Sequence, residues 1–142
     1  AFMEAHCWSA LAGDAVNAGP FDCSFTYRPQ TISGPLWGSN LSLLTHLIGT
    51  PYLPKIEGGI LFLEEIGEAP YAVERMLLQL FHAGILQKQK ALVLADFSDC
   101  EPEPDRFPYA MEHVVDVAKK LTLPFGAIAT LGITPGSFAL SY

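Results

Sequence analysis

Gly58–Tyr71, which reads GGILFLEEIGEAPY, decides the fold class of this chain. The apolar run Ile60–Leu63 leads into Glu64 and Glu65, a turn with glycine and proline follows, and an amphipathic helix comes next. This order is typical of a buried strand that carries acids to the end of a sheet, where α/β proteins usually bind their ligands. We therefore predict an α/β domain with an acidic cleft at that edge.

The sequence after this stretch predicts a helix and a second strand. Pro70 suits the first position of a helix, because the amide hydrogen that proline lacks would have no partner there. Ala91–Ala95 is another apolar strand, and it again ends in an acid, Asp96. The order strand, helix, strand predicts a parallel pair with a right-handed crossover. The apolar face of the helix follows spacings of three and four residues, with Val73, Met76, Leu77, Leu80 and Phe81.

The rest of the chain predicts further helices, strands and a closing β-hairpin. Its length of 142 residues is enough for one domain with a hydrophobic core. A proline at position 35 places the strand that contains it near a sheet edge. Helices are expected over Ala1–Leu11, Leu41–Ile48 and Tyr109–Val117, and strands over Phe21–Tyr27, Ile32–Trp37, Ala127–Thr134 and Ser137–Tyr142, the last two paired as the hairpin.

Composition and charge argue against several classes of protein. The formal net charge is -7 with only 8 Lys and Arg, which argues against nucleic acid binding, because phosphate contacts depend on these residues. No apolar run approaches the roughly 20 residues of a membrane-spanning helix. Cys7, Cys23 and Cys100 are widely separated and lack the spacing of zinc ligands, so we expect three free thiols, as in a reducing compartment.

Glu64 is the foremost candidate for chemistry. From the residues alone, a solvated acid at a strand end, or a partner of the following helix dipole, outweighs a catalytic role. Glu65 and Glu68 add two carboxylates nearby. Because strand side chains alternate, Glu64 and Glu65 should face opposite sides of the sheet, which weakens a paired-carboxylate mechanism. No histidine stands at a spacing that favours a metal site.

Gly38-Ser39-Asn40 opens the helix at Leu41, and Ser39 or Asn40 can cap its free amides. Binding of an anion by these amides is a weaker possibility. Trp37 is better explained as a core residue than as a ligand contact. The four histidines all fall in predicted helices, where a helix-face residue is the plainer interpretation than a base: His6, His46, His82 and His113.

Several motifs, taken in order, resemble a known enzyme family. They are Leu36–Leu44 (LWGSNLSLL), Ile48–Pro54 (IGTPYLP), Gly59–Tyr71, Val73–Leu77 (VERML) and Leu121–Ala127 (LTLPFGA). Together they resemble the LD-carboxypeptidases, the muramoyltetrapeptide carboxypeptidases of serine peptidase family S66. The likeness covers nearly the whole chain and corresponds to the carboxy-terminal domain of the family.

The resemblance implies a swivelling β/β/α domain and a metal-free enzyme without cofactor. It implies removal of the terminal D-alanine from murein tetrapeptide in cell-wall recycling, by a Ser-His-Glu triad whose glutamate matches Glu64. Asn40 matches a family position and is a candidate for substrate binding or loop shaping. A homodimer in the cytoplasm is the family's usual form, and the periplasm is left open. Two alternatives are a peptidase for microcin-like peptide antibiotics and a non-catalytic muropeptide-binding domain.

The chain departs from the family pattern at several points. The amino-terminal domain that carries the serine is absent, and a helix that begins at Ala1 without a cap also indicates a longer protein. The Gly-His loop before Leu121 is absent too, so we expect a missing segment near residues 117–119. Ser39 replaces the second glycine of the usual Trp-Gly-Gly-Asn, which should stiffen that loop. On this interpretation the chain alone is inactive, because it supplies one triad member.

Overall fold

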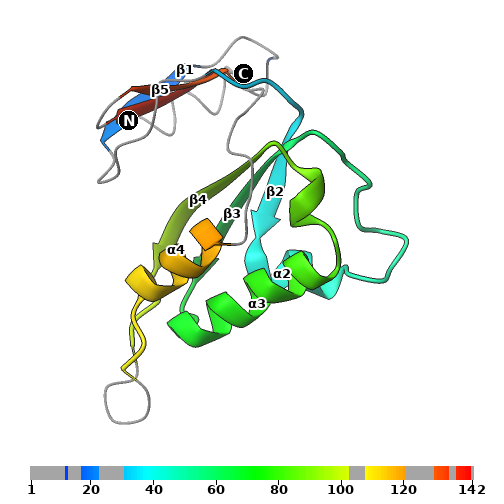
Figure 1. Ribbon diagram of the computed structural model, residues 1–142, viewed down its shortest axis with the longest axis vertical. Helices are drawn as coiled ribbons and strands as arrows, with labels where there is room; N and C mark the ends of the chain where they lie inside the picture. Colours follow the sequence, from blue (N-terminus) through cyan, green and yellow to red (C-terminus); the bar gives the residue numbers. More distant parts are fainter. Residues whose placement is uncertain are drawn as a thin grey trace.

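The computed structural model describes residues 12, 17–22, 31–102, 108–120, 130–134 and 137–141, and two three-stranded sheets organise them (Figure 1). The parallel sheet has the order β2-β3-β4, with β2 at Leu36–Asn40, β3 at Ile60–Ile66 and β4 at Ala91–Ser98. The antiparallel sheet has the order β1-β6-β5, with β1 at Asn17–Asp22, β6 at Ser137–Ser141 and β5 at Thr130–Thr134. These sheets confirm the predicted α/β class, the parallel pair and the closing hairpin.

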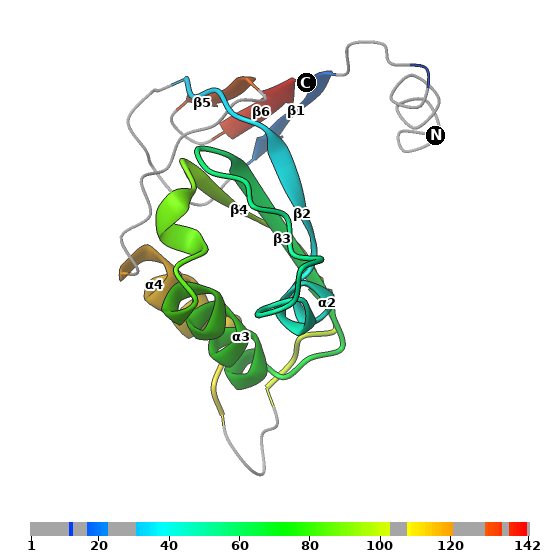
Figure 2. The same cartoon turned by 90° about the vertical axis from the view of Figure 1, so that its right-hand side faces the viewer.

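The helices gather on one side of the parallel sheet (Figures 1 and 2). They are α2 (Leu41–His46), α3 (Pro70–His82), the short 3-10 helix η1 (Leu86–Lys88) and α4 (Met111–Lys120). Helix α3 contacts both α2 and α4, whereas the antiparallel sheet stands clear of α2 and α3. No helix in the described ranges is long and apolar enough to cross a membrane.

The hydrophobic core lies between the parallel sheet and α3. Leu61 and Leu63 of β3 are fully buried, and Leu92 of β4 lies beside them. The predicted apolar face of α3 packs against these strands. Phe81 is partly buried, and the other four residues of this face are buried: Val73, Met76, Leu77 and Leu80. The spacing of apolar residues therefore identified the packing face of α3 correctly.

Some elements begin or end away from their predicted bounds. β1 starts at Asn17 rather than Phe21, and residues 23–27 lie outside the described residues. β2 starts at Leu36 rather than Ile32, because Pro35 has no amide hydrogen and contributes only its carbonyl oxygen, which accepts from Ile60 N at 2.8 Å. β2 is nevertheless an edge strand, as predicted.

The helix bounds differ in the same way. α2 ends at His46 rather than Ile48, and residues 47–49 form a turn that closes on Gly49 at φ +82°. α4 runs over Met111–Lys120 and passes residues 117–119 without a break, so the missing segment expected there stays a prediction. The expected helix Ala1–Leu11 and the motif Leu121–Ala127 lie outside the described residues.

Helix α4 is held against α3 by a tyrosine that precedes it. The Tyr109 hydroxyl donates to a carboxylate oxygen of Glu74 on α3, and the His113 ring stacks on Tyr109 with 4.8 Å between ring centroids. The hydrogen bond to Glu74, together with burial and the negative charge of that carboxylate, raises the pKa of Tyr109 to about 12. The phenol therefore stays protonated and remains a donor across the neutral range.

A buried glutamine ties the start of the parallel sheet to the core. Trp37 Nε1 donates to Gln89 Oε1 at 2.8 Å, and Gln89 Nε2 donates to the carbonyl oxygens of Ile56 at 2.9 Å and Ile85 at 3.1 Å. Gln89 is only 3% exposed, so these contacts satisfy a side chain that burial would otherwise penalise. Trp37 is itself buried within the hydrophobic core, which confirms its prediction as a core residue.

At Gly38 the backbone of β2 leaves no room for a side chain beside β3. Its φ is +141°, and a Cβ there would lie 1.8 Å from the carbonyl oxygen of Phe62, its register partner on β3. Gly49 also has a positive φ, of +82°, yet a Cβ there would meet no atom within 4 Å. The first glycine of the motif is therefore required by steric contact as well as by backbone conformation.

We expect Gly38→Ala to lower the free energy of unfolding by more than about 3 kcal/mol, because backbone strain of about 1–3 kcal/mol adds to the clash with β3. Gly49→Ala is the matched control and should cost only the left-handed strain, about 1–2 kcal/mol. Urea denaturation of the two variants measures both values. Equal losses would contradict the close approach of the two strands.

We expect Gln89→Ala to cost about 1–3 kcal/mol, because it leaves the Trp37 donor and two carbonyl oxygens without partners. Gln87→Ala removes a comparable but exposed hydrogen bond, from Gln87 Nε2 to the Phe81 carbonyl at 2.9 Å, and should change stability by less than about 0.5 kcal/mol. Thermal denaturation compares the pair, and a Gln89→Ala variant as stable as the Gln87→Ala control would refute the assignment.

Candidate active site

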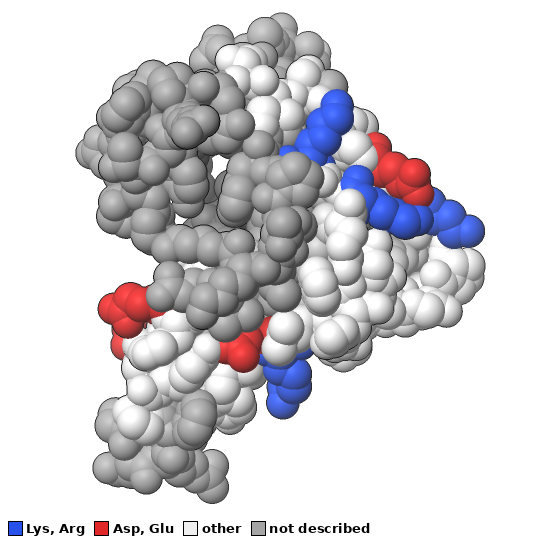
Figure 3. Space-filling model, viewed as in Figure 1, with Lys and Arg blue, Asp and Glu red and all other residues white. Residues whose placement is uncertain are grey.

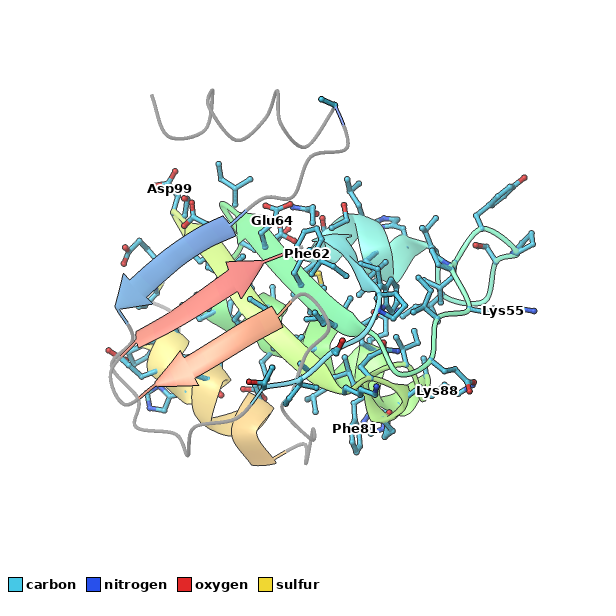
Figure 4. All side chains as sticks on the ribbon, turned by 90° about the horizontal axis from the view of Figure 1, so that it is seen from above. Lys55, Phe62, Glu64, Phe81, Lys88 and Asp99 are labelled. Carbon is cyan, nitrogen blue, oxygen red and sulfur yellow. The ribbon has the colours of Figure 1, made fainter. Side chains whose placement is uncertain are left out.

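The two acids of β3 face opposite sides of the parallel sheet, as alternation predicts. Leu61, Leu63 and Glu65 face the helices and are buried, with Glu65 only 3% exposed. Phe62 and Glu64 face the other way and are partly buried (Figure 4). The sequence predicts a strand over Ile60–Glu64, and β3 continues two residues further, to Ile66, so Glu64 lies within the strand rather than at its end.

A bulge in β4 opens the sheet beside Glu64. Leu63 is paired with Leu94, but Glu65 is paired with Phe97, so two residues of β4 stand opposite Glu64 alone. Both of these residues, Ala95 and Asp96, are exposed. Bulges bend the strand that carries them and occur often beside active sites, where they redirect a side chain. Asp96 accepts from the Ser98 hydroxyl at 2.8 Å. Glu64 thus lies where the regular ladder is interrupted.

Glu65 is held by three donors on the helix side. Its Oε1 accepts from Asn40 Nδ2 at 2.6 Å and from Ile66 N at 3.0 Å, and its Oε2 accepts from Ser42 N at 2.8 Å. Burial raises the pKa of the Glu65 carboxyl, but the hydrogen bonds from Ile66, Asn40 and Ser42 outweigh burial and hold that pKa below its usual range. The carboxylate is therefore ionised and engaged at neutral pH.

Asn40 caps α2, as predicted. Its Oδ1 accepts from Leu43 N at 3.1 Å and from the Ser42 hydroxyl at 2.8 Å, while its Nδ2 donates to Glu65. These contacts support the shaping of the loop, and contact with a substrate stays a prediction. Ser39 is exposed and has no positive φ, so the residue that replaces the family's second glycine stands there without backbone strain.

Within the described ranges, the histidines and Cys100 have contacts of their own, whereas His6, Cys7 and Cys23 lie outside the described residues. His46 Nδ1 lies 2.6 Å from the Ser42 carbonyl oxygen, and His82 packs edge-on against Phe81. Burial raises the pKa of the Cys100 thiol, which lies behind the turn after β3. In the part of the chain that the structure describes, no group of three or more histidine, cysteine or acidic residues could hold a metal ion.

The other end of the parallel sheet carries mixed charge and a shallow pocket. Lys88 of η1 and Glu57, which precedes β3, form an ion pair at 2.7 Å. Lys88 and Lys55 both lie far from Glu64 (Figure 4). Basic and acidic side chains stand side by side on this part of the surface (Figure 3). A pocket of about 240 Å³ lies there too, lined in part by Trp37 and Gln89. Neither feature reaches the acids of β3.

The sequence offered Glu64 and Asn40 as candidate site residues, which stay predictions, but did not indicate the hydrogen bonds of Glu65. The alternation of β3 already placed Glu65 on the helix side. The signal that could have completed the inference is the motif Ser39–Ser42 (SNLS), because a helix that starts there presents free amides to any nearby carboxylate. The pairing of strands far apart in sequence was needed to show that Glu65 reaches them.

Comparison with known proteins identifies the family. Residues 33–142 match the family described as LD-carboxypeptidase C-terminal domain. A Bacillus subtilis protein named "probable murein peptide carboxypeptidase" is 39% identical over 88 residues, which are 62% of this chain and 28% of that protein. The crystal structure of muramoyltetrapeptide carboxypeptidase from Oxalobacter formigenes has a TM-score of 0.87 and 33% identity, covering 99% of this chain and 54% of that one.

A more distant likeness concerns the fold alone. The microcin C7 self-immunity protein MccF has a TM-score of 0.59 and 18% identity, covering 90% of this chain and 41% of that one. The chain spans between about a quarter and about half of the length of these proteins. The matched range contains the whole parallel sheet. It therefore includes Gly38, where a side chain would clash with β3, and the adjacent acids Glu64 and Glu65. The chain therefore belongs to the LD-carboxypeptidase family, of which it matches the carboxy-terminal domain.

Proposed function

We propose that this chain is the carboxy-terminal part of a serine-type LD-carboxypeptidase that removes the terminal D-alanine from murein tetrapeptide. In this proposal Glu64 is the glutamate of a Ser-His-Glu triad. The serine belongs to an amino-terminal domain, and the histidine belongs to the Gly-His loop that in the family precedes the motif matched by Leu121–Ala127 and that this sequence lacks. The chain by itself is then inactive, because it supplies one of three interacting groups.

The placement of Glu64 carries this proposal. Its side chain is partly buried, on a strand whose other face is packed under the helices. Among the described residues, no hydrogen bond or ion pair engages its carboxylate, whereas every oxygen of Glu65 is occupied by the scaffold. A carboxylate that is held by a strand and that none of the described residues engages can accept a hydrogen bond from an imidazole.

Such a carboxylate has a defined task in serine hydrolysis. The serine hydroxyl attacks the carbonyl carbon of the scissile bond while the histidine takes its proton, and the imidazole becomes positively charged. A carboxylate that accepts from the other ring nitrogen fixes the tautomer of the histidine and stabilises that positive charge. The histidine then gives the proton to the leaving amine as the C–N bond breaks, and D-alanine departs. Water hydrolyses the remaining acyl-serine with the histidine again as base, which restores the serine. No step requires Glu64 itself to become protonated.

The proposal extends to the assembly of the site. The tetrapeptide binds between this domain and the domain of the serine, so that Glu64 meets the histidine at their junction. Asn40 is the candidate for contact with the peptide, and a homodimer is the proposed state of the complete protein. Cleavage of microcin-like peptide antibiotics gains no support from MccF, because 18% identity carries only the fold.

We expect Glu64→Gln in the complete protein to lower the turnover of murein tetrapeptide by about four orders of magnitude, as neutralising the acid of a comparable triad does. Release of D-alanine measures the effect, and circular dichroism checks that the variant is folded. Glu57→Gln is the matched control, because its exposed carboxylate lies at the far end of the sheet and should leave turnover unchanged. Release near the unmodified rate by Glu64→Gln would refute the triad role.

A substrate comparison separates the proposed activity from its alternatives. The complete protein should release D-alanine from murein tetrapeptide and leave a peptidyl nucleotide of the microcin type intact. Cleavage of the nucleotide conjugate alone would favour the antibiotic peptidase. Tight binding of tetrapeptide without any cleavage would favour a non-catalytic muropeptide-binding protein.

A further inference from the structure

Glu65 joins the three segments that meet at the candidate site. Its carboxylate receives the side-chain amide of Asn40 at the end of β2, the backbone amide of Ser42 in the first turn of α2, and the backbone amide of Ile66 at the end of β3. Only 3% of Glu65 is exposed, so solvent does not compete for these bonds. Buried hydrogen bonds to an ionised acceptor are among the stronger ones in proteins.

We propose that Glu65 is a positioning residue, which fixes the end of β3 and thereby the direction in which Glu64 presents its carboxylate. The inference deepens the proposed function and rests on the triad role of Glu64. Glu65 itself faces the helices, away from the side on which Glu64 lies, so it acts through the backbone and not on the substrate.

The pairing of β3 explains why the backbone around Glu64 needs the hydrogen bonds that Glu65 accepts. On one side, Glu64 is paired with Asn40, the last residue of the edge strand β2. On the other side, the bulge in β4 breaks the regular register between Leu63 and Glu65. The backbone of Glu64 therefore has the last pair of the β2 ladder on one flank and an interrupted ladder on the other. Glu65, the residue after Glu64, is hydrogen-bonded to Asn40 and to the first turn of α2. These contacts fix the backbone of β3 from the side of the helices.

The three hydrogen bonds to Glu65 persist at neutral pH because its carboxylate is ionised there. The donors around Glu65 hold its pKa below the usual range, so the carboxylate accepts all three hydrogen bonds at neutral pH. Glutamine at this position keeps the shape of the side chain but replaces one acceptor oxygen with an amide group that meets a donor. The scaffold would then shift, and a displacement of about 1 Å at a catalytic group can cost roughly 100-fold in rate.

The test measures kcat and KM for murein tetrapeptide in the complete protein. Glu65→Gln should lower kcat by about 10- to 100-fold and leave KM within about twofold, because positioning acts on the reacting geometry. Gln89→Ala is the control for destabilisation alone. It removes buried hydrogen bonds in the same core, far from Glu64, and its kcat per folded molecule should not change. A wild-type kcat for Glu65→Gln, or a loss that merely tracks its unfolded fraction, would overturn the inference.

A double variant then asks whether Glu65 acts through Glu64. In a Glu64→Gln background, Glu65→Gln should change the residual kcat by less than about threefold, because the group to be positioned is already lost. If instead its full effect persists in that background, Glu65 acts independently of Glu64 and the inference fails. The proposed function fails separately, and recognisably, if Glu64→Gln alone retains normal turnover.

Discussion

The alternation of side chains along β3 is the constraint on which the candidate site depends. Successive residues of a strand point to opposite faces, so two adjacent acids cannot serve the same surface. Glu65 turns towards the helices, where it is buried, and Glu64 turns to the other side, where it is partly exposed. One carboxylate therefore becomes part of the scaffold, and the other, which no described residue engages, is the candidate for chemistry.

A buried carboxylate is stable only where enough donors replace water. Here the donors come from the start of α2, the end of β2 and the backbone of β3 itself. The contacts from Asn40 and Ser42 tie β3 to β2 and α2 across the connection of residues 47–59. The close packing of Gly38 against Phe62 brings β2 near enough for this to happen. The family motifs around Gly38 and around Glu64 thus meet in one place, although 25 residues separate Asn40 from Glu65.

Much of the fold could be predicted from local patterns. Apolar runs located β3 and β4, a spacing of three and four residues identified the buried face of α3, and polar side chains near position 40 indicated a helix cap. Each of these signals is local, because it depends on the alternation or the helical period within one element. Less predictable was the bulge in β4, which is a property of the pairing between strands.

By itself, the sequence determined the class of fold, the membership of the family, and the choice of Glu64 as the candidate catalytic acid. Only the tertiary structure decided what Glu65 does and how the sheets are completed. β1 pairs with β6 from the other end of the chain, and Glu65 reaches donors on two other elements. The physical reason is that hydrogen bonds between segments distant in sequence leave no periodic trace in either segment. They exist only once packing has brought those segments within about 3 Å of each other.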